Sequence, residues 1–485
     1  MPPNDLEPTA ARRTLILAIC CMSLFIVGID NTIVNVALPA IQHDLHASVS
    51  GLQWVISAYT VVIASLLLLA GSTGDRFGRR RVFQIGLALF TLGSVLCSLA
   101  PGLQWLIAAR VVQAAGGSML NPVAMGIITN TFTGAAERAR AIGVWGAVAG
   151  VSMSLGPVIG GLLVGSVGWQ AIFWINLPVG LAAMALAQRY VPESRAARPR
   201  RPDPVGQVLM VVLLGLLTYT LIEAPEAGWT ATRTLLGFLV AALSAVGFVF
   251  WELRVAEPLI DPRFFRSLPL SGATVIAVSG FASLAGFLFL NTLYLQDVLG
   301  YSALRAGLYV LPLAGTAAVL APVSGRLVGS RGPRLPLLVS GVAMALSALL
   351  LTGLSTRTPL LQLLAAYVVF GIGFGMINAP ITNTAVSGMP RSQAGVAAAV
   401  ASTSRQTGQS LGVAVIVSVV VSSVHGPLKG GFTQASHAGW WIIVGFGVLV
   451  VLLGILSTGN RAVQTADRVA DRLTPTDPRT PITTP

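Results

Sequence analysis

Charged residues, and lysine above all, are scarce in this chain of 485 residues. Only 10% of its residues are charged, 54% are hydrophobic, and lysine occurs once, as Lys429. Average soluble proteins carry about 25% charged residues, so the composition indicates a chain that crosses a membrane several times. The phosphate-binding loop of nucleotide-driven proteins requires a lysine after its glycines, and GPLKGG around Lys429 does not supply that pattern. We therefore expect no nucleotide and no other cofactor.

Cysteine and histidine are also rare, and their positions argue against a disulfide framework, a metal site or an enzyme. The three cysteines lie in apolar runs, where they are typical small core residues. The four histidines lie in predicted outer loops without metal-ligand spacing and without a nucleophile motif nearby. The net charge is +13, but the basic residues form no continuous face with interleaved aromatics, which argues against nucleic acid as a partner.

Apolar runs long enough to cross a bilayer, which takes about 20 residues, recur fourteen times. They cover approximately residues 14–38, 52–70, 82–100, 103–123, 141–164, 170–188, 205–222, 234–252, 270–292, 303–325, 335–354, 359–380, 395–421 and 438–457. With the N-terminus inside, twenty-four basic residues fall on inner segments and four on outer ones. This positive-inside bias predicts an all-α, multi-pass protein of the cell membrane with both termini in the cytoplasm.

The stretch GSTGDRFGRRR, residues 71–81, joins the second and third apolar runs, and we predict a charged hairpin of about ten residues there. It combines one acid, Asp75, with four arginines, which mark the cytoplasmic side. Its glycines permit tight turning and close backbone approach. The residues expected to act in this loop are Gly71, Asp75, Arg76, Gly78, Arg79 and Arg80.

A degenerate copy of this loop, GRLVGSRGPR, follows at residues 325–334. It keeps glycines at Gly325 and Gly332, whereas Gly329 stands in place of Asp75. Internal repeats of this kind build transporters that alternate access around a central site. We predict two six-helix halves with a helix pair inserted between them: an N-terminal bundle at 1–190, a cytoplasmic linker at 191–204, the inserted pair at 205–252, a C-terminal bundle at 253–458 and a disordered cytoplasmic tail at 459–485.

Two charged residues lie deep inside predicted spans, Asp30 in the first and Arg110 in the fourth. A charge at mid-bilayer costs about 2.5–3.5 kcal/mol on insertion scales, so each one needs a reason. A helix rises 1.5 Å per residue, and this rise places the two residues at similar depth. Two interpretations stay open: an ion pair that fixes helix packing, or a protonatable carboxylate in a cavity whose proton affinity the arginine modulates.

A third intramembrane charge, Arg405, lies in the thirteenth run beside Gln406. This polar patch either lines a cavity or makes hydrogen bonds between helices. Asn31 and Gln113, together with Arg405 and Gln406, are our candidates for cavity lining. The fifth run, GVWGAVAGVSMSLGPVIGGLL, carries a face of small residues for close helix packing and a proline that favours a kink; its candidates are Gly156, Pro157, Gly160 and Gly161.

These stretches together carry a family resemblance. The 71–81 loop is similar to the signature loop of the major facilitator superfamily, and SLGPVIGG resembles the antiporter motif of its exporters. With IDNTIVNVALPAI, Arg110 followed by Gln113, Gly116 and Gly117, and fourteen spans, the chain resembles the fourteen-helix drug:proton antiporter branch over essentially its whole length. Ala114, where the fourth-helix motif often has glycine, is one departure.

The resemblance implies the fold of that superfamily with a 6+2+6 arrangement of helices. It also implies export of drugs or other amphipathic or cationic small molecules in exchange for protons. Asp30 would then carry the proton, with Arg110 as its modulator, and Asp75 with the loop arginines would latch the cytoplasmic side against the N-terminal end of the thirteenth span. Two other functions stay open: export of one specific metabolite or self-made antibiotic by the same mechanism, and a non-transporting membrane sensor or scaffold.

Overall fold

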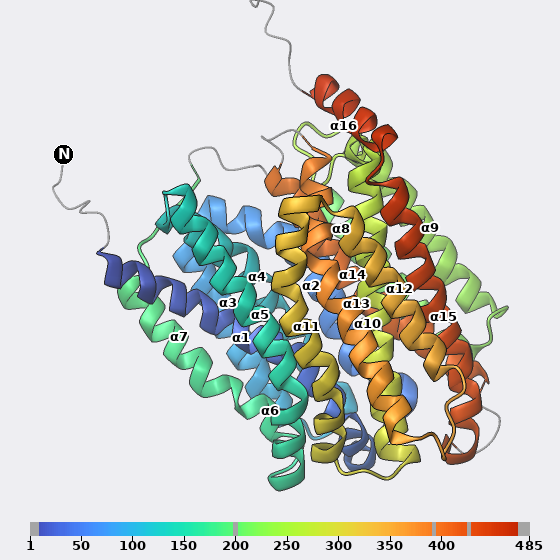
Figure 1. Cartoon of the computed structure of the whole chain (residues 1–485). Coiled ribbons are helices and arrows are strands. Elements are labelled where there is room, and N and C mark those ends of the chain that lie inside the picture. Colours follow the sequence, from blue (N-terminus) through green and yellow to red (C-terminus); the bar gives the residue numbers. More distant parts are fainter. Residues whose placement is uncertain (1–8, 197–201, 390–393, 424–427, 474–485) are drawn as a thin grey trace, which may run out of the picture.

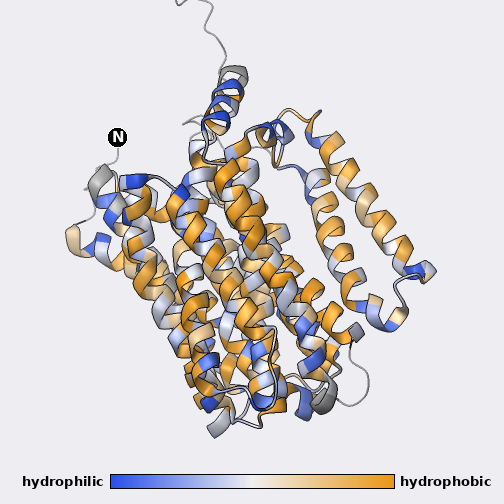
Figure 2. Ribbon diagram, turned by 45° about the vertical axis from the view of Figure 1, so that its right-hand side comes forward, coloured by the Kyte–Doolittle hydropathy of each residue, from blue (hydrophilic) through white to orange (hydrophobic). Residues whose placement is uncertain are grey.

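The computed structural model describes residues 9–196, 202–389, 394–423 and 428–473. Every regular element in these ranges is helical. Fourteen helices in the described part of the chain are long and apolar enough to cross a membrane, which confirms the predicted number. Figure 1 shows these helices side by side in one bundle. Figure 2 shows apolar residues along the middle of the helices and polar residues gathered toward their ends.

The first half of the chain supplies six spans. They are α1 (Ala10–Leu45), α2 (Val49–Phe77), α3 (Arg79–Ser98), α4 (Leu103–Thr131), α5 (Ala135–Ser166), and α6 (Ala171–Trp174) with α7 (Asn176–Tyr190), which together make the sixth. The Nε of Arg12 donates to the carbonyl of Tyr190 at 3.2 Å, so α1 begins where α7 ends. We call this end of the bundle, which also carries the α2–α3 turn, the arginine-rich end.

The second half repeats the pattern. Its elements are the 3-10 turn η1 (Pro262–Arg266), α10 (Leu268–Leu293) continued by the π-helical η2 (Tyr294–Val298), α11 (Ala303–Arg331), α12 (Arg334–Leu351), α13 (Leu360–Ser387), α14 (Ala394–Ser423) and α15 (Leu428–Leu456). The two halves pack on each other along two seams, α5 against α11 and α2 against α14.

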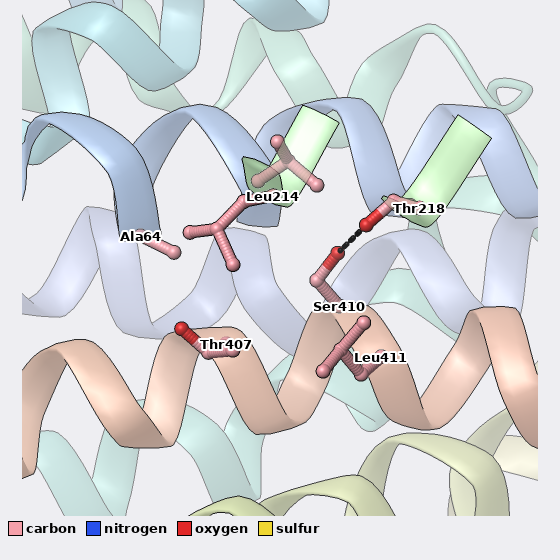
Figure 3. A pocket seen from close by; sticks show the side chains of 7 residues that line it. Ala64, Leu214, Thr218, Thr407, Ser410 and Leu411 are labelled. Carbon is pink, nitrogen blue, oxygen red and sulfur yellow. Dashed lines mark hydrogen bonds between the residues drawn. The ribbon is translucent and has the colours of Figure 1, made fainter. Parts of the chain in front are cut away.

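The inserted pair, α8 (Pro204–Ala227) and α9 (Thr232–Glu252), covers the second of these seams. Helix α8 packs on both α2 and α14, whereas α9 packs mainly on α8. Gln207 of α8 donates to the carbonyl of Ser65 in α2 at 2.6 Å. On the other side, the hydroxyls of Thr218 and Ser410 are 3.3 Å apart, and Figure 3 shows this hydrogen bond from α8 to α14. The inserted pair is thus bonded to both halves.

The predicted ten-residue hairpin at 71–81 is wrong. Helix α2 continues through Phe77, and α3 begins at Arg79, so Gly78 alone makes the turn. Gly78 has φ +114°, a conformation that residues with a side chain rarely adopt, which lets the chain reverse within one residue. The charged residues therefore lie on the ends of two helices and not in a loop. The repeat is visible here: Gly332 makes the same kind of turn between α11 and α12, with φ +79°.

The prediction of a disordered tail from residue 459 is wrong for its first part, since residues Asn460–Leu473 form α16. Ala462, Ala466 and Val469 recur at helical spacing and are buried. The hydroxyl of Thr465 accepts the backbone N–H of Leu268 at 3.0 Å, which fixes α16 to the start of α10. The prediction missed this helix because the segment is mostly polar and its apolar stripe consists of only a few residues. The rest of the predicted tail, 474–485, and residues 197–201 of the predicted linker lie outside the described residues.

Candidate functional site

Asp30 and Arg110 form a buried ion pair inside the first half. Nη1 of Arg110 lies 2.5 Å from Oδ2 of Asp30, and the two side chains are 2% and 0% exposed. Arg110 also donates from Nε to the carbonyl of Val55 at 3.1 Å, and its guanidinium lies 4.0 Å from the ring centre of Tyr59. This contact agrees with the similar depth predicted for the two residues. Cation, carboxylate and ring thus hold α1, α2 and α4 together.

Gln113 completes this network, and it is not among the residues that line the small cavity between the two halves. Its Nε2 donates to Oδ1 of Asp30 at 2.9 Å and to the hydroxyl of Ser94 at 2.8 Å, while its Oε1 accepts from Arg110 at 2.6 Å. Asn176 of α7 also donates to Ser94, at 3.2 Å. Both oxygens of Asp30 are therefore bound, so the geometry is that of an ionised carboxylate with its charge matched.

A small cavity lies between the two halves, close to this network. It measures about 30 Å³, enough for a water molecule but not for a drug-sized compound. Five helices line it through Asn31, Thr32, Asn35, Ile56, Thr60, Met153, Leu284, Ala285, Leu288, Gln409 and Val413. Of the expected lining residues, Asn31 borders this cavity, whereas Arg405 and Gln406 do not. Gln409, one turn beyond Arg405 in the same polar patch, is the polar residue of α14 that borders the cavity.

The small residues of α5 bring it against helices of both halves. A Cβ on Gly160 would lie 2.7 Å from Ile33 of α1, and one on Gly161 would lie 2.6 Å from the carbonyl of Ala303 in α11. Gly307 of α11 in turn lies directly against the carbonyl of Pro157. The motif therefore serves two contacts at once, one within its own half and one across the seam.

Sequence comparison decides the family. The model of the Major Facilitator Superfamily matches residues 20–413. This chain belongs to that superfamily. Multidrug resistance protein Stp of Mycobacterium tuberculosis is 38% identical over 392 residues, which cover 80% of this chain and 72% of that protein. The Tetracenomycin C resistance and export protein of Streptomyces glaucescens is 41% identical over 381 residues, covering 78% of this chain and 70% of that protein.

Solved structures agree on the fold of this superfamily member. The D-xylose-proton symporter superposes with a TM-score of 0.65 over 92% of this chain and 97% of its own, at 14% identity. A bacterial homologue of the human drug peptide transporters PepT1 and PepT2 gives a TM-score of 0.63 over 95% and 100%, at 15% identity. Such low identities show the fold alone.

The residues of the 71–81 stretch, expected from the resemblance to act as a signature loop, lie at the α2–α3 turn. Asp75 accepts from Arg79 at 2.8 and 3.0 Å, and Arg76 lies over the ring of Phe77 at 5.7 Å. A Cβ on Gly71 would lie 3.6 Å from Pro122 of α4, an ordinary van der Waals distance. The residues just before α14, against whose start we expect Asp75 to act, are 390–393, which lie outside the described residues. The structure thus gives Asp75 a partner within its own turn, and its role as a latch stays a prediction.

Glu193, just after α7, is a partner of this turn that sequence reasoning missed. Its carboxylate accepts the backbone N–H groups of Arg80 and Arg81 at 3.1 and 3.3 Å, which caps the N-terminus of α3. Two main-chain bonds support it, from Arg79 to Ser194 and from Ala196 to Asp75, at 2.9 and 3.0 Å. An anion at the N-terminus of a helix is stabilised by the helix dipole. The available signal was a lone acid in the otherwise basic stretch VPESRAARPRR.

Arg405 makes a hydrogen bond between helices, one of the two interpretations left open for its polar patch. Its Nη2 donates to the hydroxyl of Thr382 in α13, and its Nη1 to the hydroxyl of Ser402 at 3.2 Å. Unlike Arg110, it forms no ion pair with any carboxylate in the described part of the chain.

Proposed function

We propose that this chain is a proton-driven antiporter that exports amphipathic, drug-like molecules across the cell membrane by alternating access. The observation that carries the proposal is the buried Asp30–Arg110 pair, in which a titratable carboxylate holds three helices of one half. A group placed there can convert a change of protonation into a change of helix packing. The relatives' names, which refer to multidrug resistance and to antibiotic export, support the transport class.

Coupling follows from the bonding of Asp30. When the carboxylate is ionised, it accepts charge-assisted bonds from Arg110 and Gln113. A proton that enters from outside neutralises Asp30, and the attraction to Arg110 is lost. The N-terminal half then relaxes toward the state in which the cavity opens outward and the exported molecule leaves. Release of the proton to the cytoplasm restores the pair and resets the transporter. The transported molecule and the proton thus shift the same equilibrium, the one between the inward-open and outward-open states of the transporter.

The packing of α5 suggests where the halves move. Gly161 and Pro157 close the α5–α11 seam at the end opposite the arginine-rich end, and opening outward requires them to separate. The turn around Gly78, with Asp75 and the loop arginines, would stabilise the state in which the cytoplasmic side is closed. In this scheme, the small size of the cavity between the halves corresponds to a state of the transporter in which the two halves are closed around the central cavity.

One alternative has specific support. A pump for a single metabolite or self-made antibiotic would use the same mechanism. Two relatives are named after single antibiotics: the Tetracenomycin C resistance and export protein, and the Methylenomycin A resistance protein of Streptomyces coelicolor. Catalysis is not proposed, because members of this superfamily transport small molecules. We place the chain in the cell membrane with both termini in the cytoplasm, on the strength of the positive-inside bias.

The test uses purified protein in liposomes with an imposed pH gradient. Uphill movement of a panel of chemically diverse toxic compounds, lost in Asp30→Asn, supports proton-driven export. Movement of one compound class only would favour the single-substrate alternative. Absence of any gradient-dependent movement across the panel would refute the proposal.

A further inference from the structure

Arg405 is a cation inside the membrane-spanning bundle with only neutral partners. It bonds to the hydroxyls of Thr382 and Ser402, and its Nε has no partner among the described residues although it is buried. A guanidinium has five N–H donors in a planar fork, so most of its bonding capacity is unused. A buried charge without a counter-charge is costly, which is why such groups in membranes mark ligand or ion pathways.

The sequence itself excludes a carboxylate partner from helices α11 to α15, which include α14 and its neighbours α13 and α15. No Asp or Glu occurs between Asp297 and Asp467, a stretch that contains all of α11 to α15. In the other half, the deep acid Asp30 is matched by Arg110 and Gln113. The interior around the central cavity therefore holds one neutral ion pair and one unmatched positive charge.

Arg405 lies on the face of α14 that reaches the central cavity one turn further along. Gln409, four residues later and on the same face of α14, lines the central cavity. Helices α10 and α14 run parallel, with Gly408 against Val278, so Arg405 is level with Val275. Val275 is 42% exposed although most of α10 is buried. An exposed apolar side chain thus lies at the level of Arg405, and this level lies between the cavity and the arginine-rich end.

We infer that Arg405 is the recognition point for an acidic group on the transported molecule, such as a carboxylate or an acidic phenol. The site takes an amphipathic anion or zwitterion, and not a simple cation, because the fork of Nε and Nη suits two oxygens and the nearby interior offers a cation no unmatched acid. The apolar and amide residues of the central cavity would hold the body of the molecule. This inference rests on the proposed export function and specifies its substrate class.

The test measures equilibrium binding, without any pH gradient, to the full-length protein in phosphatidylcholine nanodiscs. The probes are rhodamine B and its ethyl ester, which share one aromatic cation and differ only in the free carboxylate. We expect the acid to bind wild-type protein about tenfold or more tightly than the ester, the size of effect expected for a hydrogen bond to a charged group. Equal binding, or tighter binding of the ester, would overturn the inference.

Variants locate the preference. Arg405→Gln should abolish the difference between acid and ester, and Arg405→Lys should keep part of it, since the charge remains but the fork is lost. Arg305→Gln is the matched control, because it removes the same charge at an exposed position of α11 and should leave the preference unchanged. If Arg405→Gln fails to fold, the wild-type comparison and the lysine variant still decide.

A lipid headgroup could also occupy the guanidinium, and one addition to the nanodiscs distinguishes it from a transported acid. Addition of phosphatidylglycerol should leave the binding of the acid unchanged; loss of the preference would assign the guanidinium to a lipid headgroup and overturn its substrate role. Because no gradient is applied, the outcome does not depend on whether Asp30 carries the coupling proton. The two tests can therefore give separate answers. Export could fail while the preference for the acid holds, or export could succeed while the preference is absent.

Discussion

The hydroxyl of Thr32 in α1 donates to the backbone carbonyl of Met153 in α5 at 3.2 Å, and shares this bond with its own-helix carbonyl of Ile29 at 3.3 Å. In a regular helix the Met153 carbonyl would accept the N–H of residue 157, but that residue is proline and has none. Helix α1 therefore satisfies the acceptor that the proline leaves open. Gly156 permits the approach, since a Cβ there would collide with Thr32.

The first prediction concerns this bond. Thr32→Val keeps the shape of the side chain but leaves the Met153 carbonyl unsatisfied, which should cost about 1–3 kcal/mol of stability. Thermal unfolding of the purified protein measures it, and Thr32→Ser, which keeps the hydroxyl, is the control. In the Pro157→Ala background, residue 157 regains an N–H, so the same Thr32→Val change should cost much less. If the two changes are additive, the hydroxyl does not replace the missing bond.

The second prediction concerns Asp30. Asp30→Asn should abolish uphill, gradient-driven export while exchange down a substrate gradient persists. It should also lower stability by about 3–5 kcal/mol, because Arg110 stays buried without its counter-charge. The double variant Asp30→Asn/Arg110→Gln should regain stability but not pumping. Uphill transport at the wild-type rate in Asp30→Asn would show that the proton is carried elsewhere.

The third prediction concerns the α2–α3 turn. Glu193→Gln removes the charge that caps α3, worth about 0.3–1 kcal/mol at a partly exposed helix N-terminus, and should slow transport. Gly78→Ala should be more harmful, because it forces a side chain onto φ +114° and against the Glu193 carboxylate. Glu137→Gln, at an exposed ion pair with Arg13, is the control. The measurement is the transport rate of each variant, corrected for its protein level in membranes. Equal rates in all three variants would exclude a role in transport for the Glu193 cap of α3.

The fourth prediction concerns the seam between α5 and α11. Gly307→Val places a side chain against the Pro157 carbonyl and should hold the two halves apart at that end. We expect strongly reduced transport at normal protein level. Gly315→Val is the matched control on the same helix, since no atom lies within 4 Å of the position its Cβ would take. Loss of transport in both variants would point to a general effect of the larger side chain.

The fifth prediction concerns topology. A fluorescent reporter fused after Arg472 should be active, because it remains in the cytoplasm. The same reporter fused at Gly228, between α8 and α9, should be inactive, since that turn lies on the opposite side. Activity at Gly228 together with silence at Arg472 would invert the orientation derived from the charge bias.

The sequence by itself determined the number of spans, the repeat and the deep charges. A membrane span needs about 20 consecutive apolar residues, so each span can be identified from its own stretch of sequence. The similar depth of Asp30 and Arg110 also followed from the sequence, because helix rise translates residue number into depth. The lack of any acid between Asp297 and Asp467 is likewise a property of the chain alone, whereas the structure shows that no acid of the fully described helices α2 and α8 pairs with Arg405.

Tertiary structure decided which groups meet. Gln113 binds Asp30 and does not line the cavity, because its direction depends on how α4 rotates against α1 and α3. Glu193 caps α3 from more than 100 residues away, which no local pattern records. Helix α16 packs against the start of α10, where the hydroxyl of Thr465 accepts the backbone N–H of Leu268. The polar composition of this segment did not predict that contact. Membrane spans can be predicted because they depend on the hydropathy of consecutive residues. Side-chain contacts between helices cannot, because they depend on the packing of segments far apart in the chain.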